Sequence, residues 1–254
     1  SADRTARLWN AGSGKCLRTL YGHRGAVMHA AYSPDGAMLL TASVDCTAKL
    51  WNADSGWCVR TLQGHGNAVC STSFSPDGSA ILTASLDATA RLWITDSGEC
   101  SHTLTCCDVV NSATFSPDGS SVITAGADRM AKLWSTESGE RIRTFEGHSG
   151  GVMCAAFSPD GALLLTASRD YTAKLWNADS GEYLRSLESH HRISSVAFSP
   201  DGSLVVIGFE YAAAQLWDPE SGECVRILEN RGRGVRSVVF SPPPRLAVLP
   251  GSRP

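Results

Sequence analysis

Histidine, threonine and aspartate residues recur along this 254-residue chain at spacings that could support hydrolytic chemistry. A histidine that pairs with a carboxylate and a hydroxyl can activate that hydroxyl as a nucleophile. The same combination occurs three times, as His23, Thr41 and Asp45, as His65, Thr83 and Asp87, and as His148, Thr166 and Asp170. An active site needs one unique combination, so the regular recurrence favours a structural role over a catalytic one.

Two further segments have residue types that could bind a ligand. Residues 12–16 contain glycine and lysine but lack the glycine spacing and the Lys-Ser/Thr end of a phosphate-binding loop. Cys106 and Cys107, beside Cys70, could hold a soft metal ion, but the pattern offers no nearby fourth ligand. We therefore expect no metal site, no cofactor and no catalytic residues.

Three sequence markers recur with the same period of about 42 residues, and such a period determines the architecture. A tryptophan stands at positions 9, 51, 93, 134, 176 and 217. The tetrapeptide Ser-Pro-Asp-Gly begins at residues 33, 75, 116, 158 and 199, and a Ser-Gly pair begins four residues after each tryptophan. Three markers in one phase indicate a chain of repeated structural units.

Each unit contains four short runs of apolar and β-branched residues, such as 27–32, 38–42, 48–52 and 58–62, and each run is too short for a globular helix. Ser-Pro-Asp-Gly is a turn sequence, because proline fixes φ and glycine can adopt a positive φ. The unit is therefore predicted to be a four-stranded antiparallel meander with strands a, b, c and d. Such a sheet has two apolar faces, so successive sheets must stack around an axis as a β-propeller.

The repeated motifs resemble those of WD40 repeats over essentially the whole chain. The resemblance rests on Gly-His pairs that end at His23, His65 and His148, on Phe/Tyr-Ser-Pro-Asp-Gly, and on Leu-Trp-Asn. Only Trp217-Asp218 is a literal Trp-Asp pair, so most repeats depart from the family at this position. The resemblance implies a chain of hydrogen bonds within each of three sets: His23, Thr41, Asp45 and Trp51; His65, Thr83, Asp87 and Trp93; and His148, Thr166, Asp170 and Trp176.

The sequence predicts a single WD40 propeller domain over residues 1–254, with six blades. Five complete units span residues 23–62, 65–104, 107–145, 148–187 and 190–228. The sixth blade is expected to be composite, with c and d strands from residues 4–20 and a and b strands from residues 233–249, because the step from Trp217 round to Trp9 is then one repeat long. The alternative is that the chain is a fragment of a longer array.

Three units depart from the repeated polar pattern. Cys107 is expected at the histidine position of the third complete unit. In the fifth, Ile207 and Tyr211 replace the threonine and the aspartate, so His190 lacks its partners. In the composite blade, Arg231 takes the histidine position. Two explanations fit these changes. The motif could have been lost by drift in blades where a redundant scaffold does not need it, or the residues of the last two blades could have changed from a structural role to binding.

Lysine or arginine also recurs two residues before each of the first five repeat tryptophans, a pattern that could suggest a nucleic-acid-binding stripe. The residues are Arg7, Lys49, Arg91, Lys132 and Lys174. On a strand, this spacing places each cation on the same side of the sheet as its tryptophan, where its stem covers apolar surface. We expect these residues to support the fold.

Arginines that do not recur gather in the d–a and b–c connections, which a four-stranded meander places on one face of the propeller. Connections on a rigid scaffold commonly carry binding residues, and guanidinium groups pair with carboxylates and phosphates. This face is therefore expected to bind a protein or peptide partner, and an acidic or phosphorylated one if the arginines take part. The predicted partner-binding residues, including three at the channel mouth, are Arg24, Arg169, Arg192, Arg231, Arg233 and Arg236, with Met28, Cys70 and Met153.

The favoured function is a non-catalytic WD40 scaffold for protein–protein interaction. A second hypothesis is a reader of phosphorylated or acidic ligands, including RNA, which depends on the arginines alone. A propeller enzyme is disfavoured, because it would need a unique acid–base or nucleophile set in the central channel. We expect a monomer within a larger complex.

Composition and charge narrow the class of protein further. The net charge of -3 and the pI of about 6.1 give no broad positive field for nucleic acid or an anionic membrane. No run approaches the roughly 18 apolar residues of a membrane helix, and the first residues lack the apolar core of a signal peptide. The expectation is an intracellular protein, cytoplasmic or nuclear, that does not bind membranes.

Overall fold

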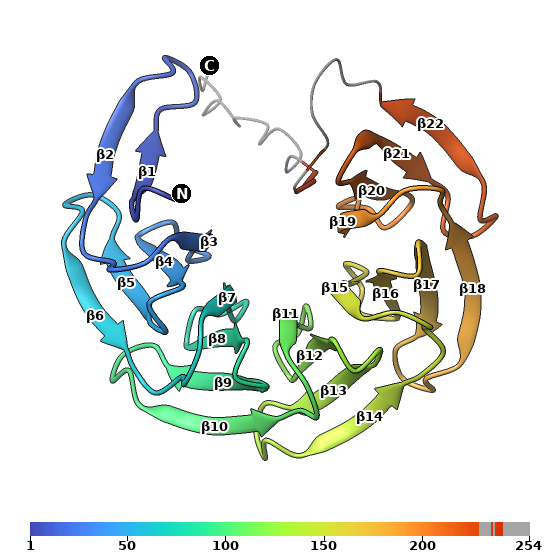
Figure 1. The fold of residues 1–254 in the computed structure, drawn as a ribbon, viewed down its shortest axis with the longest axis horizontal. Coiled ribbons are helices and arrows are strands. Elements are labelled where there is room, and N and C mark those ends of the chain that lie inside the picture. Colours follow the sequence, from blue (N-terminus) through green and yellow to red (C-terminus); the bar gives the residue numbers. More distant parts are fainter. Residues whose placement is uncertain (229–234, 236, 241–254) are drawn as a thin grey trace, which may run out of the picture.

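The computed structural model describes residues 1–228, 235 and 237–240. Within these residues, 22 β-strands form six antiparallel sheets. Figure 1 shows the sheets side by side around a central axis, with each four-stranded sheet extending from the centre to the outer edge. The all-β propeller architecture predicted from the repeat is confirmed. In this part of the chain, no helix is long and apolar enough to cross a membrane.

Five of the sheets have four strands in chain order, with the first strand innermost and the fourth outermost. The sixth sheet contains β1 (Ala6–Trp9) and β2 (Cys16–Leu20). The four-stranded sheets are formed by β3 (Val27–Tyr32), β4 (Met38–Ser43), β5 (Ala48–Asn52) and β6 (Cys58–Leu62); β7 (Val69–Phe74), β8 (Ala80–Ser85), β9 (Thr89–Ile94) and β10 (Cys100–Thr105); β11 (Val110–Phe115), β12 (Ser121–Gly126), β13 (Ala131–Ser135) and β14 (Arg141–Phe145); β15 (Val152–Phe157), β16 (Leu163–Ser168), β17 (Thr172–Asn177) and β18 (Tyr183–Glu188); and β19 (Ile193–Phe198), β20 (Val205–Phe209), β21 (Ala212–Trp217) and β22 (Cys224–Leu228).

The Ser-Pro-Asp-Gly segments form the turns between the first and second strands. In the first of them, the Ser33 hydroxyl and the Ala37 N–H donate to Asp35 Oδ1 at 2.6 and 3.0 Å, and Gly36 has a φ of 75°. The turn between the third and fourth strands lies beside it, since Ala53 N–H donates to Ala37 O at 2.9 Å. We refer to the surface made by both kinds of turn as the turn face: residues 33–37, 75–79, 116–120, 158–162 and 199–203, with 10–15, 53–57, 95–99, 136–140, 178–182 and 218–223.

The opposite surface is made by the connections between sheets and by the turns between second and third strands. These segments are joined by backbone hydrogen bonds, such as Val44 N–H to Ala26 O at 2.9 Å and Leu86 N–H to Ala68 O at 3.0 Å. We refer to this surface as the loop face: residues 21–26, 63–68, 106–109, 146–151 and 189–192, with 44–47, 86–88, 127–130, 169–171 and 210–211.

Apolar side chains fill the spaces between neighbouring sheets. Trp51 packs against Leu39 of its own sheet and against Leu8 and Leu20 of the preceding sheet. The repeat tryptophans at positions 51, 93, 134 and 176 are all buried, whereas Trp9 is 58% exposed. Burial of an indole between two sheets is therefore common to four of the five four-stranded sheets, whereas Trp217 of the fifth is half-buried and the two-stranded sheet lacks this feature.

Long side chains on four of the outermost strands fasten their sheets to the turns of the next. Arg60 uses both terminal nitrogens to bond to the carbonyls of Asp96 and Ser97. Arg143 makes the same pair of bonds to the sheet that follows its own. His102, at the equivalent position on β10, makes a single bond of 3.0 Å from Nε2 to a turn carbonyl. The fastening between the sheet of β7 to β10 and the sheet of β11 to β14 is thus weaker than those made by Arg60 and Arg143, as is the fastening at β2, where Arg18 Nε donates to Asp54 O at 3.1 Å.

The composite blade stays a prediction, because most of residues 233–249 lie outside the described part of the chain. Two contacts border the place where its inner strands are expected. On one side, Val235 N–H donates to Phe209 O at 2.7 Å, and on the other, Val27 N–H donates to Ser1 O at 3.0 Å.

We propose that residues 233–249 complete the sheet of β1 and β2. Among the described residues, β1 pairs only with β2 and leaves its inner edge unpaired, and an unpaired edge promotes aggregation. A chain that ends at residue 240 should therefore unfold at a lower urea concentration, and aggregate more, than a control chain that ends at residue 250. Equal midpoints for the two chains would argue against the composite blade.

Candidate functional site

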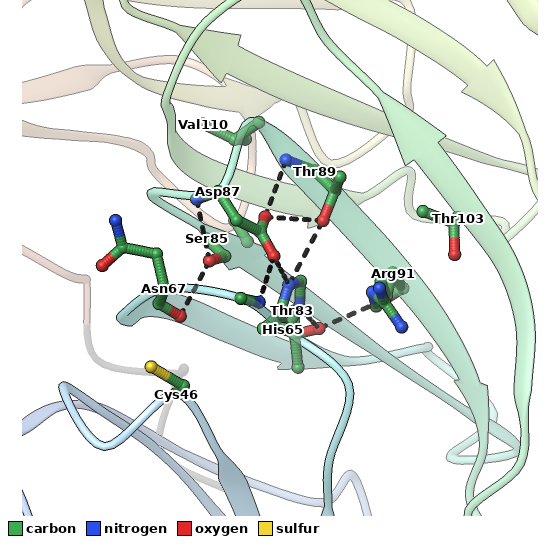
Figure 2. A network of polar contacts seen from close by, with 12 residues as sticks. Cys46, His65, Asn67, Thr83, Ser85, Asp87, Thr89, Arg91, Thr103 and Val110 are labelled. Atoms are coloured by element: carbon green, nitrogen blue, oxygen red, sulfur yellow. Dashed lines mark hydrogen bonds and ion pairs between the residues drawn. The ribbon is translucent and has the colours of Figure 1, made fainter.

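Each recurring set of polar side chains joins three segments of one sheet. In the sheet of β7 to β10, His65 Nδ1 lies 2.9 Å from Asp87 Oδ2, and His65 Nε2 lies 2.8 Å from Thr83 Oγ1. Trp93 Nε1–H donates to the same threonine hydroxyl at 2.8 Å. Figure 2 shows His65 between Thr83 and Asp87, with Thr89 beside the carboxylate.

The same geometry recurs in two other sheets. His23 and His148 each lie 2.9 Å from an aspartate carboxylate and 2.8 Å from a threonine hydroxyl. Each threonine accepts a tryptophan N–H at 2.8 Å. The structure thus brings together the other two predicted sets: His23 with Thr41, Asp45 and Trp51, and His148 with Thr166, Asp170 and Trp176.

Each aspartate also ties the connection between sheets to the adjacent turn. Asp87 accepts hydrogen bonds from Gly66 N–H at 2.9 Å and from the N–H and hydroxyl of Thr89 at 2.9 and 2.6 Å. The Ser85 hydroxyl donates to Asn67 O at 3.1 Å (Figure 2). The loop face is therefore held to the sheet beneath it by side-chain as well as backbone hydrogen bonds.

Burial and hydrogen bonding determine whether the histidine and the aspartate of each polar set are charged. Burial lowers the pKa of His23, His65 and His148, and the paired aspartates offset only part of this effect. Burial raises the pKa of Asp45, but hydrogen bonds, led by that from Thr47, outweigh it and hold this pKa at about 2. The histidine is then neutral, its Nδ1–H donates to the carboxylate, and the threonine hydroxyl donates to Nε2. This pairing is the one that activates a hydroxyl in hydrolytic triads, but each threonine here is completely buried and also accepts a tryptophan N–H, so no substrate can reach it.

Acidification below pH 6.5 is expected to destabilise the protein before its carboxylates titrate. The folded-state pKa of these histidines lies below the unfolded-state value of about 6.5, so the unfolded chain binds more protons as the pH falls. Their contribution to stability is present above about pH 6.5 and is lost as the pH falls through that value. Urea unfolding at pH 7.5 and pH 5.0 measures the loss. His65→Gln should reduce it, whereas His190→Gln, a change at an exposed position, should not.

The third complete unit uses Cys106, and not the predicted Cys107, at the histidine position. Cys106 Sγ lies 3.7 Å from Thr124 Oγ1, which accepts Trp134 Nε1–H at 2.9 Å, while Cys107 is exposed. The connection that precedes this position is one residue shorter than in the histidine-containing units: Cys106 follows Trp93 by 13 residues instead of 14. Counting 14 residues from the preceding tryptophan therefore reaches Cys107, one residue past the position that Cys106 occupies.

Two units without a histidine pair their aspartate with the recurring cation instead. In the third complete unit, Asp128 forms an ion pair with Lys132, and only 11% and 3% of these side chains are exposed. In the two-stranded sheet, Asp3 Oδ2 lies 2.7 Å from Arg7 Nη2. Where the histidine is present, the cation bonds elsewhere: Lys49 Nζ donates to a threonine hydroxyl on β6 at 2.7 Å. The histidine and the cation are thus alternative partners for one carboxylate.

The fifth unit has no polar set of this kind. Its connection is also one residue shorter, so Ser189 and not His190 stands four residues before the first strand residue, as His148 does in the preceding unit. Ile207 is fully buried where the other units have threonine. Trp217 Nε1 consequently has no hydrogen-bond partner among the described residues.

The repeats themselves match a known family model, WD40: WD domain, G-beta repeat. The matches cover residues 14–52, 56–93, 98–135, 139–177 and 181–218, which is well over half of the chain. The chain belongs to the WD40 repeat family. One curated relative, the nuclear distribution protein PAC1 of Mycosarcoma maydis, is 49% identical over 41 residues, 16% of this chain and 9% of the relative. The chain thus matches only a small part of that protein's length. WD40 repeats imply a scaffold for protein interaction.

The predicted partner-binding residues of this WD40 chain fall into three groups. Arg24, Arg169 and Arg192 are exposed on the loop face. Met28 is also exposed, and Met153 Sδ accepts a hydrogen bond from Arg169 Nε at 3.1 Å. The remaining arginines lie outside the described residues: Arg231, Arg233 and Arg236.

Cys70 makes an internal contact. Its thiol donates to Val110 O of the neighbouring sheet at 3.0 Å, and burial raises its pKa to about 11. The nine cysteines of the chain are all unpaired. Within the residues that the structure describes, no three His, Cys, Asp or Glu side chains lie close enough together to hold a metal ion.

Three exposed apolar side chains next to the aspartates of the loop face were not singled out from the sequence: Val44, Leu86 and Tyr171. Each stands next to the anchored aspartate of its turn, so the backbone there is fixed while the side chain projects outward. That adjacency is a usable sequence signal, because an apolar residue beside a buried aspartate in a surface turn has no core to enter.

Residues 147–151 spell Gly-x-Ser-x-Gly, the pattern of an esterase nucleophile elbow. That elbow requires a sharp turn from a strand into a helix. Ser149 instead lies in a connection between two strands, and the adjacent His148 is bonded to Asp170 and Thr166. The pattern therefore lacks the structural context that its chemistry needs.

Proposed function

We propose that this WD40 chain is a non-catalytic scaffold that binds a protein partner on its loop face. The proposal is supported chiefly by apolar side chains exposed over well-anchored connections. Val44, Leu86 and Tyr171 project from this face, together with Met28, which is 56% exposed. Apolar groups held in place by a rigid scaffold supply affinity with little loss of conformational entropy.

The charges of the loop face favour an acidic partner. Arg24, Arg169 and Arg192 are exposed, whereas the side chains of Asp45 and Asp87 are only 10% and 13% exposed. Beside these turns, a partner would therefore meet the guanidinium groups before the carboxylates of Asp45 and Asp87, while the exposed acids of this face, Asp108 and Glu146, stand on other connections. Because guanidinium forms forked hydrogen bonds to carboxylate and phosphate, we infer a protein or peptide with acidic or phosphorylated residues.

The proposal also covers catalysis, the cellular compartment and the oligomeric state. We infer no catalysis at the polar sets, because each threonine hydroxyl is completely buried beneath its tryptophan and the set recurs without one unique copy. We place the protein inside the cell, in the cytoplasm or nucleus, as one monomer within a larger complex. The net charge of -3 supports neither a membrane surface nor nucleic acid as the main ligand.

The test uses the immobilised chain as bait and mass spectrometry of the retained proteins at 50 and 150 mM NaCl. The combined change of Arg24, Arg169 and Arg192 to glutamate should abolish retention of the main partners. The matched control changes Arg141 and Arg226, on outermost strands, to glutamate and should retain them.

Two results would overturn the proposal. Equal retention by the loop-face variant and its control would move the binding surface elsewhere. Loss of the retained proteins after nuclease treatment, with RNA recovered from the untreated bait, would favour the RNA reader.

A further inference from the structure

The fifth complete unit lacks a hydrogen bond that the four preceding units share. In those units, an outer turn of the turn face donates a backbone N–H to the inner turn beside it, as Ala178 does to Ala162 O at 2.9 Å. The corresponding residue of the fifth unit is Pro219, which has no N–H to donate. The carbonyl of Ser203, at the position of Ala162, therefore has no backbone donor among the described residues.

The arginine that faces these turns from the preceding sheet is not fastened to them. Arg143 bonds through both terminal nitrogens to the carbonyls of Asp179 and Ser180. Arg185 takes the same place on β18 as Arg143 does on β14. Within the described part of the chain, however, it makes no hydrogen bond or ion pair with another residue. Its guanidinium still reaches the next sheet, since a methyl group added to Gly222 would lie 2.8 Å from Arg185 Nη1.

A cavity of about 640 Å³ lies at this interface, between β18 and the turns of the next sheet. At the preceding interface, which Arg143 fastens, the corresponding space is only about 260 Å³, and its lining includes three serines and three aspartates. The larger volume is within the range of small-ligand sites. The wider space thus occurs where the bond between the turns and the fastening by arginine are both missing.

Leucine side chains form one wall of this cavity. Leu175 pairs with Arg185 on one side and with Leu165 on the other, so these three side chains share the sheet face that packs against β19 and β20. Leu163 lies two residues before Leu165 and therefore on the same face. Leu184, the extra residue of a bulge in β18, also lines the cavity and is 42% exposed. The wall is therefore apolar, with the guanidinium of Arg185 beside it.

The opposite wall supplies hydrogen-bond acceptors and negative charge. Hydrogen bonds from the Glu220 and Ser221 N–H groups lower the pKa of Asp218, and the charge of Arg185 adds to this effect. Glu220 is exposed. The cavity is thus bordered by one cation, two carboxylates and the Ser203 carbonyl. The residues of this wall are Gly202, Ser203, Asp218, Pro219 and Glu220.

We propose that this cavity binds a free α-amino acid with an apolar side chain. The carboxylate of the amino acid accepts forked hydrogen bonds from Arg185. Its ammonium group donates to Ser203 O and lies beside the carboxylates of Asp218 and Glu220. Its side chain covers Leu163 and other leucines of the apolar wall, which removes apolar surface from water.

The mixture of charges favours an amino acid over a peptide end. The C-terminus of a peptide would bring a carboxylate to the two carboxylates of the cavity without an ammonium group to offset them. The N-terminus of a peptide would leave the guanidinium of Arg185 without a partner. Only a zwitterion matches both charges and still places an apolar side chain on the same carbon atom. The site lies on the turn face, so it does not depend on the function proposed for the loop face.

The test is a saturation-transfer NMR titration of the whole chain with L-leucine at pH 7. N-acetyl-leucine lacks the ammonium group, leucine amide lacks the carboxylate and glycine lacks the apolar side chain, and each should bind about tenfold more weakly. Arg185→Met should weaken leucine binding about tenfold, because it removes hydrogen bonds to a charged group. Pro219→Ala should also weaken it, because the restored N–H occupies Ser203 O.

Arg143→Met is the matched control, since it removes the equivalent arginine at the preceding interface and should leave the affinity for leucine unchanged. Arg185→Met loses no hydrogen bond of the described structure, so its urea midpoint should equal that of the parent, which separates loss of the ligand from unfolding. Equal weakening by these two variants would overturn the placement of the carboxylate.

Three other results would also count against the proposal. Unchanged affinity in Pro219→Ala would overturn the role of the Ser203 carbonyl. Binding of N-acetyl-leucine or leucine amide as tight as that of leucine would overturn the free amino acid in favour of a peptide end. Failure of leucine to bind more tightly than glycine would overturn the whole proposal.

Discussion

Replacing Lys132 with methionine is expected to lower the free energy of unfolding by about 3 to 5 kcal/mol, because it leaves the Asp128 carboxylate without its partner. Both side chains of this ion pair are almost completely removed from solvent. Methionine has a similar length and no charge, so the change mainly reports the loss of pairing and not a loss of volume. Urea unfolding at pH 7 measures the effect.

The same substitution at Lys49 is the control. There the carboxylate of Asp45 keeps His23 as its partner at 2.9 Å. Lys49→Met loses only the bond to the Thr61 hydroxyl, which is expected to cost about 1 kcal/mol. Equal losses at the two positions would show that the recurring cation acts through packing and not through pairing with the aspartate.

Trp93→Ala is expected to cost about 3 to 5 kcal/mol, as a large-to-small change within a packed interior. Trp93 is buried between two sheets and donates to the Thr83 hydroxyl. Trp217→Ala should cost less, because Trp217 is only half-buried and its Nε1 has no partner among the described residues.

Phenylalanine variants separate the hydrogen bond from the packing. Trp93→Phe should lose about 1 kcal/mol more than Trp217→Phe, since only the former breaks a bond. Unfolding free energies for all four variants give the comparison. If the free energy of unfolding falls as much for the Trp217 variants as for the Trp93 variants, the hydrogen bond to the polar set adds nothing to the contribution of the tryptophan to stability.

The propeller and the polar sets could be predicted because the repeat carries the same information several times. The distance in sequence from His65 to Thr83 and on to Trp93 is the same in each complete set, so one spacing specifies all of them. The pairing of Asp128 with Lys132 could not be predicted in this way. Both residues recur in other units, and whether they meet depends on the absence of a competing histidine, which only the three-dimensional structure reveals.

Two other residues show why local counting fails. Cys106 takes the histidine position because the connection before it is one residue shorter. The sequence alone does not show whether the missing residue lies before or after the histidine position. Cys70 was expected at the channel mouth. The register of β7 against β8 shifts between Val69 and Ser71, so Cys70 is the extra residue of a bulge and turns its thiol to the neighbouring sheet.

The single bond made by His102 has a mechanical consequence. In a row of repeated units, stability is approximately a sum of unit and interface contributions, and partial opening starts where the sum is smallest. Arg60 and Arg143 each cross their interface with two bonds, whereas His102 crosses with one. The interface beside β10 should therefore open before the two that Arg60 and Arg143 fasten, and amide hydrogens should exchange and proteases should cut there first of the three. One histidine in place of arginine thus sets the order in which these three nearly identical interfaces come apart.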